Sequence, residues 1–258
     1  MGLQRQAGLL VDPAGHWRLP GVRWLLTFLL FFSRGFPVTS TSHIKRQACP
    51  ACLRPQSACI CQWVRPVVHE VEVLILQHPL EVANPKGSAR LLHLSLPHSR
   101  LVTGEVFDVP ALLEAPPGTG AAPASLRQSI LLYPDTPLDQ APDLATPPAL
   151  APALLRRPAR LRLVVLDGTW RKSRKMLYAN PALQQLPRLA LQDMPASHYL
   201  IRKAHRPDQL STLEATCAAL ARLHGGAKPF EPLLAAFDGF VAQQAACRSA
   251  GGLHMPGY

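Results

Sequence analysis

The chain is poor in acidic and in aromatic residues. It has 16 Asp and Glu against 27 Lys and Arg, which leaves a formal net charge of +11 and a pI near 9.9. This imbalance predicts an anionic partner, with nucleic acid in first place and a membrane surface in second. Aromatic residues are only 6% of the chain, which argues against an extensive base-stacking platform of the RRM type.

The chain also lacks a hydrophobic run long enough to cross a bilayer. The apolar stretch at residues 24–32 has nine residues, whereas a spanning helix needs roughly 20. Arginines flank this stretch, so residues 1–42 resemble a secretory signal, an organellar transit segment or an extension from an upstream start codon. We treat residues 1–42 as a variable or targeting-like extension, and we expect a cytoplasmic protein without stable membrane association.

The six cysteines are distributed unevenly. Four of them, Cys49, Cys52, Cys59 and Cys61, lie within thirteen residues, whereas a disulfide framework would spread its cysteines over a small secreted chain. Two close pairs of thiolates can close a tetrahedral shell around Zn²⁺. We therefore predict a structural zinc knuckle over residues 43–66. An iron–sulfur cluster and free or disulfide-paired cysteines are the alternatives.

Alternating apolar and amphipathic segments follow the cysteines. We predict strands at residues 72–76, 99–107, 129–133, 161–166 and 188–191, and helices at 88–96, after Thr169, at 211–224 and at 229–247. Residues 110–124 are expected to form a short helix and a loop. The proline-rich segment 135–160 reads as a surface insertion with at most one short helix. This order predicts an α/β domain with a largely parallel sheet over residues 67–248.

The strand at 161–166 ends at Asp167-Gly168-Thr169. Ligands of open α/β sheets bind at the carboxyl ends of the strands. An Asp at this position often caps the following helix, but Thr169 is the better placed N-cap. The Asp167 carboxylate is then available to a ligand. In the helix that follows we expect Trp170 on the same side as Ser173 and Leu177, with the basic residues on another side.

A second polar turn lies at Ser211-Thr212-Leu213-Glu214. Ser and Glu three residues apart match a capping box, and free N–H groups at a helix N-terminus also attract carboxylates. The helix should end at Gly225-Gly226.

Three basic clusters bracket Asp167 in sequence. They predict a track for nucleic-acid phosphates, and solvated helix faces are the alternative. Four histidines (His78, His93, His98 and His198) lack metal-ligand spacing, and we interpret them as surface or core residues. The clusters are Arg156, Arg157, Arg160 and Arg162; Arg171, Lys172, Arg174 and Lys175; and Arg202, Lys203, His205 and Arg206.

Four motifs in one order make the chain resemble the DTW-domain family, named for an Asp-x-Thr-Trp motif. They are the cysteine pattern at 49–61, Leu132-Tyr133-Pro134, Asp167-Gly168-Thr169-Trp170 and Ser211-Thr212-Leu213-Glu214-Ala215. The resemblance covers residues from about 49 to about 240. It implies a SPOUT-like fold with a carboxyl-terminal trefoil knot as the cofactor site.

The resemblance also implies a tRNA-uridine aminocarboxypropyltransferase. Such an enzyme moves the 3-amino-3-carboxypropyl group of S-adenosylmethionine to N3 of a uridine in tRNA and releases methylthioadenosine. A SAM-dependent RNA methyltransferase and a non-catalytic zinc-containing RNA-binding protein are the rival readings.

On the aminocarboxypropyltransferase reading the residues take four roles. The catalytic residues are Asp167, as the group that accepts the N3 proton, with Thr169 and Trp170. The cofactor contacts are Leu132, Tyr133, Pro134, Asp167, Gly168, Ser211, Thr212 and Glu214. The metal ligands are Cys49, Cys52, Cys59 and Cys61. The RNA contacts are Arg171, Lys172, Arg174, Lys175, Arg202 and Lys203.

Overall fold

The computed structural model describes residues 10–11, 17–18, 47–114, 127–135, 144–191 and 210–252. The chain divides into two compact units, Met1–Ile44 and Lys45–Tyr258. In the first unit the described residues form two short antiparallel strands, β1 (Leu10–Val11) and β2 (Trp17–Arg18). The second unit contains the cysteine segment and the α/β fold.

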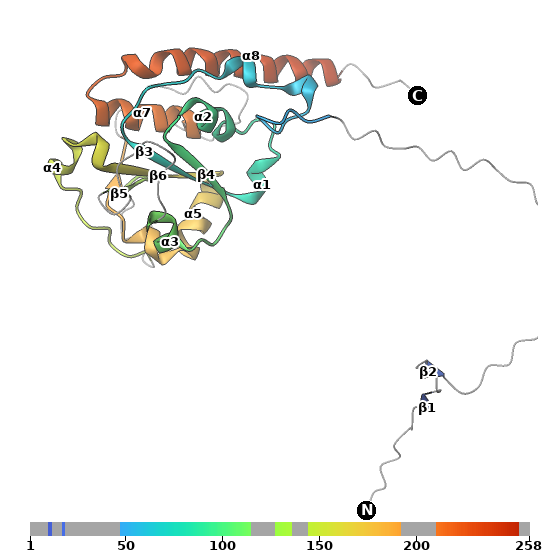
Figure 1. Cartoon of the computed structure of the whole chain (residues 1–258), viewed down its shortest axis with the longest axis horizontal. Helices are drawn as coiled ribbons and strands as arrows, with labels where there is room; N and C mark the ends of the chain where they lie inside the picture. Colours follow the sequence, from blue (N-terminus) through green and yellow to red (C-terminus); the bar gives the residue numbers. More distant parts are fainter. Residues whose placement is uncertain are drawn as a thin grey trace, which may run out of the picture. The chain divides into compact units, whose positions relative to one another are not determined.

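Five parallel strands form the sheet of the second unit (Figure 1). They are β3 (Glu72–Gln77), β4 (Ser99–Thr103), β5 (Gln128–Leu132), β6 (Leu161–Asp167) and β7 (Arg188–Leu189), in the order β4-β3-β6-β5-β7. Every residue of β3 and β6 is buried, as expected for continuous apolar runs at the centre of a parallel sheet. The predicted α/β class and parallel sheet are confirmed.

Helices cover both faces of this sheet (Figure 1). Side chains alternate along a strand, so Val73, Ile75, Leu163 and Val165 pack in the core cluster that also holds α2, α7 and α8, whereas Leu74, Leu76, Val164 and Leu166 pack with α5 and α6. The helices are α1 (Pro79–Val82), α2 (Ala89–Ser95), α3 (Val109–Glu114), α4 (Pro152–Leu155), α5 (Trp170–Ala179), α6 (Pro181–Gln184), α7 (Thr212–His224) and α8 (Glu231–Gly252). None of the described helices is both long and apolar enough to cross a membrane.

Several predicted boundaries need correction. β4 ends at Thr103 instead of residue 107, because the backbone N–H of Phe107 leaves the sheet and donates to Asn180 Oδ1 at 2.8 Å. β7 has only two residues, and α8 begins at Glu231 and continues to Gly252. In the proline-rich segment the described residues contain α4 and one 3₁₀ turn, Pro158–Arg160.

A buried charge cluster lies at the amino edge of the sheet. Glu72, 2% exposed, accepts a hydrogen bond from Arg127 at 2.7 Å. It also forms ion pairs with Arg162 at 3.0 Å and with Arg100 at 3.4 Å. Arg162 also donates to the carbonyl of Leu113 at the end of α3. Arg162 is fully buried at the edge opposite to Asp167, so the expectation that it joins a surface phosphate track is wrong.

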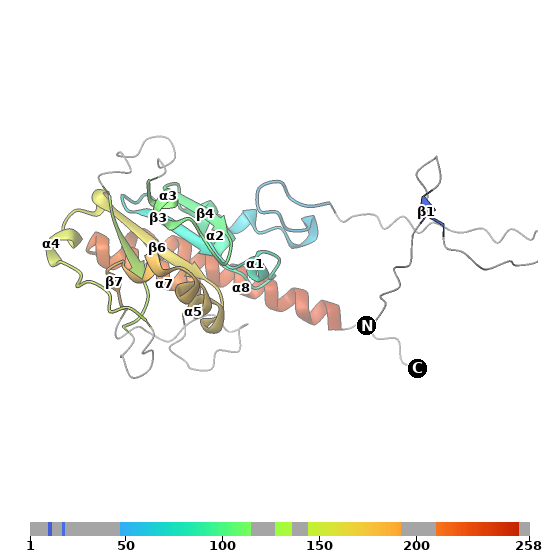
Figure 2. The ribbon, with the colours of Figure 1, turned by 90° about the horizontal axis from the view of Figure 1, so that it is seen from below.

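The cysteine segment packs against α8 (Figures 1 and 2). Trp63 Nε1 donates to Gln243 Oε1, and Gln243 Nε2 donates to the carbonyl of Cys59 at 3.1 Å. The Trp63 ring lies directly over Gly239: a Cβ built on Gly239 would be within 2.7 Å of three of its ring atoms. A side chain at position 239 would therefore displace the indole.

We expect Gly239→Ala to destabilise the protein by about 1–3 kcal/mol, the usual cost of overpacking a filled site. Helix propensity alone would favour Ala here by about 1 kcal/mol, so the sign of the change tests the contact. Urea denaturation measures it. Ala235→Gly, on the exposed side of α8, is the control and should lose about 1 kcal/mol from propensity alone. A Gly239→Ala variant more stable than wild type would contradict the packing.

A second prediction concerns His69, which is 2% exposed. Its Nδ1 lies 2.7 Å from the carbonyl of Val71 and its Nε2 accepts the N–H of His98, so Nδ1 carries the proton of the neutral ring. The pKa of His69 is lowered from 6.5 to about 4, mainly by burial; the hydrogen bond to Val71 opposes this shift, and the nearby His98 and His224 contribute to it.

Between pH 6.5 and 4 the unfolded chain therefore binds a proton that the folded chain does not. The stability contributed by neutral His69 is complete above pH 6.5 and is lost as the pH falls toward 4. We expect wild type to lose on the order of 1–2 kcal/mol more than His69→Gln between pH 7 and pH 5. Urea denaturation at both pH values measures the difference, and equal losses would contradict the assignment.

Candidate functional site

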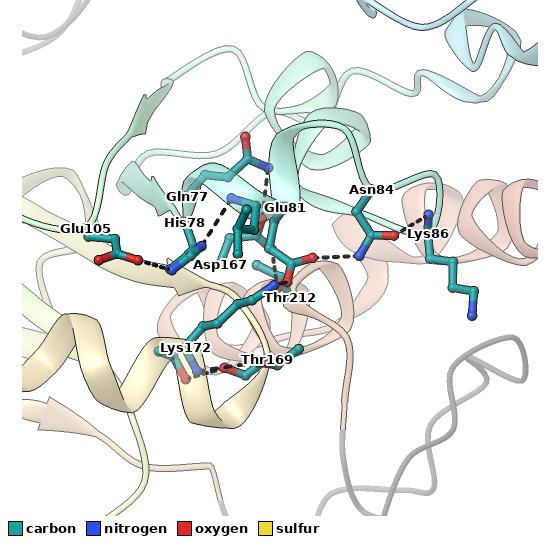
Figure 3. A network of polar contacts seen from close by, with 12 residues as sticks. Gln77, His78, Glu81, Asn84, Lys86, Glu105, Asp167, Thr169, Lys172 and Thr212 are labelled. Carbon is teal, nitrogen blue, oxygen red and sulfur yellow. Dashed lines mark hydrogen bonds and ion pairs between the residues drawn. The ribbon is translucent and has the colours of Figure 1, made fainter.

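The Asp167 carboxylate lies at the carboxyl edge of the sheet, held by two neighbouring elements (Figure 3). Asp167 is opposite Gln77 in the β3–β6 register, and its Oδ2 accepts from Gln77 Nε2 at 2.9 Å. Its Oδ1 accepts from the hydroxyl of Thr212, the first residue of α7, at 2.7 Å. The side chain is 5% exposed. These two donors orient the Asp167 carboxylate at the edge where open α/β sheets bind ligands.

A histidine–carboxylate contact and an ion pair support the same edge (Figure 3). His78 follows Gln77; its Nδ1 accepts from the N–H of Leu80 and its Nε2 lies 2.6 Å from Glu105 Oε1. Glu81, 5% exposed on α1, binds Lys172 Nζ at 2.8 Å. These contacts tie the chain after β3 to the loop after β4 and to α5, so the surroundings of Asp167 are fixed by three strands.

The predicted N-cap of α5 is confirmed. The Thr169 hydroxyl accepts from the N–H of Lys172 at 3.4 Å. Gly168 fits closely there, because a Cβ on it would lie 3.1 Å from Cβ of Lys172. Trp170 is 50% exposed, whereas Ser173 and Leu177, predicted on the same side of the helix, are buried.

An aromatic stack lies beside the motif. The Trp170 ring stacks on Tyr133, with centroids 5.2 Å apart and planes at 21°. Tyr133 is 4% exposed, and burial raises its pKa to about 12, so the phenol stays neutral at physiological pH. The Arg188 guanidinium lies 5.4 Å from the centre of the same ring. The half-exposed indole thus rests on a buried, rigid support.

The start of α7 is capped within the chain. Ser211 Oγ accepts from the N–H of Glu214, and Glu214 Oε2 accepts from the N–H of Ser211 at 2.7 Å, which confirms the capping box. The N–H of Leu213 donates to Ser88 Oγ. The helix ends at Gly225, with φ of 77°, as predicted. Three N–H groups of this turn are therefore already engaged.

The basic side chains of α5 differ in their surroundings. Lys172 pairs with Glu81, and Lys175, 64% exposed, pairs with Glu105 at 2.8 Å. Arg171 is exposed, and Arg174, also exposed, lies against the Tyr178 ring. The predicted RNA contacts Arg202 and Lys203 lie outside the described residues.

The four cysteines form one cluster. Their sulfur atoms all lie within 4.8 Å of one another; Cys49 and Cys61 are 3.6 Å apart and Cys52 and Cys59 are 3.8 Å apart. These distances are far too long for disulfides. Sulfur atoms at the corners of a tetrahedron with metal–sulfur bonds of about 2.3 Å are about 3.8 Å apart. The cluster therefore has the geometry to bind one metal ion.

The sulfurs are not equivalent. Backbone N–H groups of Cys52 and Ala51 lower the pKa of Cys49 to about 6. Burial, followed by the neighbouring sulfurs, raises the pKa of Cys61 to about 12. Without a cation, four adjacent thiolates would repel one another. A divalent metal removes that repulsion, so the donor set fits such an ion.

Comparison with known proteins identifies the family. The DTW domain model matches residues 46–245, which include the cysteine cluster, β3 to β7 and α7. The chain belongs to the DTW-domain family.

Named relatives come from animals and plants. The tRNA-uridine aminocarboxypropyltransferase 2 of Drosophila melanogaster is 29% identical over 193 residues, covering 69% of this chain and 67% of the relative. The Mus musculus protein of the same name is 26% identical, covering 73% and 60%. The tRNA-uridine aminocarboxypropyltransferase A of Arabidopsis thaliana is 30% identical over 152 residues, covering 54% and 53%. The chain thus spans about half to two thirds of these relatives. No solved structure matches it significantly.

Within this DTW domain the sequence motifs locate only part of the site. Asp167, Thr169, Ser211 and Thr212 are brought together as the motifs suggested. Gln77, His78 and Glu81 were missed because each is a single polar residue after an apolar strand. Their place in the sequence could have indicated them, because they follow β3 and the carboxyl ends of β3 and β6 lie at the same edge of a parallel sheet.

Proposed function

We propose that this chain transfers the 3-amino-3-carboxypropyl group of S-adenosylmethionine to N3 of a uridine in tRNA. The family match and the names of three relatives support the reaction class. One observation carries the proposal furthest: Asp167 of the Asp-Gly-Thr-Trp motif and Thr212 of the Ser-Thr-Leu-Glu motif are joined by a 2.7 Å hydrogen bond. Two motifs far apart in sequence thus meet at the ligand-binding edge of the sheet.

The residues at this edge suit the donor. S-adenosylmethionine combines an adenine ring, a sulfonium cation and a carboxylate. The indole of Trp170 offers an aromatic face, and aromatic faces attract planar rings and cations. Asp167 offers a negative charge and Arg188 a positive one. In this proposal the backbone of Leu132, Tyr133 and Pro134, together with Gly168, surrounds the adenosine.

Asp167 is the proposed base. The donor supplies an electrophilic γ-carbon beside its sulfonium, so the reaction needs a uracil N3 without its proton. Asp167 takes that proton, N3 bonds to the γ-carbon, and the carbon–sulfur bond breaks with its electron pair on sulfur. Gln77 and Thr212 hold the carboxylate in position throughout, which is how an oriented base gains efficiency.

The remaining motif residues act by positioning. Thr169 caps α5 and so fixes the direction of Trp170. Ser211 and Glu214 cap α7 and so fix Thr212 under Asp167. We assign the four-cysteine cluster to a structural Zn²⁺ held by Cys49, Cys52, Cys59 and Cys61, since four thiolates leave no open position for chemistry.

We further propose that tRNA phosphates contact the basic residues around α5. Arg171 and Arg174 are exposed there, and Lys172, Lys175, Arg202 and Lys203 complete the proposed track. Because Lys172 and Lys175 already pair with acids and Arg174 lies against the Tyr178 ring, Arg171 should contribute most to the salt dependence of binding.

Two proposals concern the fold and the location of the protein. The carboxyl-terminal trefoil knot is a proposal that rests on the resemblance to the family, and residues 192–209 lie outside the described residues. The cytoplasmic location remains a proposal on the reduced-cysteine argument.

The test is to incubate the purified protein with unmodified tRNA and S-adenosylmethionine and to analyse nucleosides and small molecules by mass spectrometry. We expect a uridine with the aminocarboxypropyl mass and one equivalent of methylthioadenosine. A methylated nucleoside with adenosylhomocysteine would instead indicate a methyltransferase. No product from folded, metal-loaded protein would indicate a non-catalytic RNA-binding protein.

A further inference from the structure

Arg188 is a buried cation whose binding edge has no partner. It is 7% exposed. Its Nη1 lies 3.5 Å from the carbonyl of Pro134, the limit of a hydrogen bond. Its Nε and Nη2 are buried and donate to nothing, and among the described residues no carboxylate forms an ion pair with it. Nε and Nη2 form one edge of the guanidinium, with two parallel N–H bonds that fit the two oxygens of a carboxylate.

Arg162 is a buried arginine of the same sheet that does have an ion pair, although its Nε and Nη2, like those of Arg188, make no hydrogen bond. Its Nη2 lies 3.0 Å from Glu72, and its Nη1 donates to the carbonyl of Leu113. A buried cation without such a partner is costly, by several kcal/mol. The contrast indicates that Arg188 is retained for an anion that the described residues do not supply.

The place of Arg188 connects it with the proposed active site. It lies on β7, against the ring of Tyr133, and Tyr133 stacks on Trp170 of the Asp-Gly-Thr-Trp motif. The Tyr133 ring thus lies between Arg188 and the motif residue Trp170. Tyr133 packs on the α5 face of the sheet, whereas Asp167 continues the row of Leu163 and Val165 on the α7 face. A donor that reaches both Arg188 and Asp167 lies across the carboxyl edge.

The start of α7 is a less suitable partner for the donor's carboxylate. The N–H groups of Ser211, Leu213 and Glu214 bond to Glu214, Ser88 and Ser211 respectively, and the Thr212 hydroxyl bonds to Asp167. The buried Glu214 carboxylate also places a negative charge at this turn. Arg188 offers a positive charge and two unpaired donors.

We propose that the Nε–Nη2 edge of Arg188 binds the α-carboxylate of the aminocarboxypropyl group. This inference rests on the proposed function. A carboxylate held by Arg188 fixes the position of the propyl chain. The γ-carbon, and not the methyl group, then faces the uridine N3 that Asp167 deprotonates. Arg188 is then a specificity-determining residue of the transfer.

The test compares two ligands that differ in the amino-acid group. Methylthioadenosine has the adenosine and sulfur of S-adenosylmethionine but lacks the carboxylate. By isothermal titration calorimetry, Arg188→Met should weaken S-adenosylmethionine binding about 10- to 100-fold, as expected for a charge-assisted bidentate contact. Its affinity for methylthioadenosine and for tRNA should stay within about twofold of wild type. Arg188→Lys keeps the charge but lacks the two parallel N–H donors, so its affinity for S-adenosylmethionine should lie between those of wild type and Arg188→Met.

Wild-type protein provides a test that needs no variant. Decarboxylated S-adenosylmethionine should bind at least about tenfold more weakly than S-adenosylmethionine itself. Melting temperatures of the ligand-free variants check the fold: Arg188→Met should not be less stable than wild type, since it removes an unpaired charge, whereas Arg162→Met, which leaves Glu72 with one partner fewer, should be.

The following results would overturn this inference without overturning the proposed function. Equal weakening of both ligands would place Arg188 at the adenosine. Loss of tRNA affinity with unchanged S-adenosylmethionine binding would place it at an RNA phosphate. If Arg188→Met bound all ligands as tightly as wild type, Arg188 would have no role in ligand binding. The same would follow if wild type bound decarboxylated S-adenosylmethionine as tightly as S-adenosylmethionine. If wild type binds no S-adenosylmethionine at all, the proposed function fails, and this inference fails with it.

Discussion

Asp167→Asn should abolish aminocarboxypropyl transfer while leaving tRNA binding intact. The amide has nearly the shape of the carboxylate, and its oxygen can still accept from Gln77 or Thr212, so the fold should persist. It has no capacity to take the N3 proton. Removal of a general base typically costs 10²–10⁴-fold in rate, and we expect single-turnover transfer to fall at least about 10³-fold.

Two controls separate the chemistry from the architecture. Thr212→Val removes one of the hydrogen bonds that orient Asp167 but keeps the carboxylate, so we expect a smaller loss, about 10-fold, because orientation without loss of the base is a partial defect. Filter binding should give the same tRNA affinity for both variants as for wild type. Unchanged turnover of Asp167→Asn would remove Asp167 as the base, and a parallel loss of tRNA binding would mean that the substitution disturbed the fold.

The sequence was sufficient where a pattern has one physical solution. The apolar runs of β3 and β6 must be buried on both faces, so their central place in a parallel sheet followed from composition. Ser211 and Glu214 form the predicted capping box because the spacing that defines it also closes it. The four cysteines cluster because two pairs so close in sequence can scarcely separate.

The sequence was insufficient where tertiary contacts decide. β4 ends earlier than predicted because the backbone N–H of Phe107 donates to Asn180, 73 residues later in the chain. Arg162 was predicted to be a surface cation, but it is buried in the sheet, where it pairs with Glu72. Helical periodicity groups Trp170 with the buried Ser173 and Leu177, but Trp170 is half exposed and stacks on Tyr133. Each of these outcomes depends on a residue far away in the chain.

Arg188 is the sharpest example of this limit. In sequence it is one arginine within a short apolar strand, and it belongs to none of the three basic clusters. Only the register of β7 with β5 brings it against Tyr133. Buried polar atoms without partners are visible in a structure alone, and they indicate a ligand more directly than exposed charge does.

Loss of the metal should be the largest change in stability. Cys52, 2% exposed, belongs to the same core cluster as Ile60 and Phe240, so the metal centre and the α/β core are expected to unfold together. We expect Cys52→Ser to lose its one metal equivalent and to melt about 10–20 °C lower, which corresponds to about 5 kcal/mol for a domain of this size. Elemental analysis and differential scanning calorimetry measure the two effects.

Cys247 provides the matched control. It is an exposed cysteine on α8 outside the cluster, so Cys247→Ser should keep both the metal and the melting temperature. Elemental analysis also identifies the ion: zinc is expected, because sulfurs within 4.8 Å of one another surround a single ion more closely than they would a cluster of two or four irons. Iron with acid-labile sulfide would overturn the zinc assignment. A Cys52→Ser protein with wild-type metal content and stability would show that the four sulfurs do not form a structural metal centre.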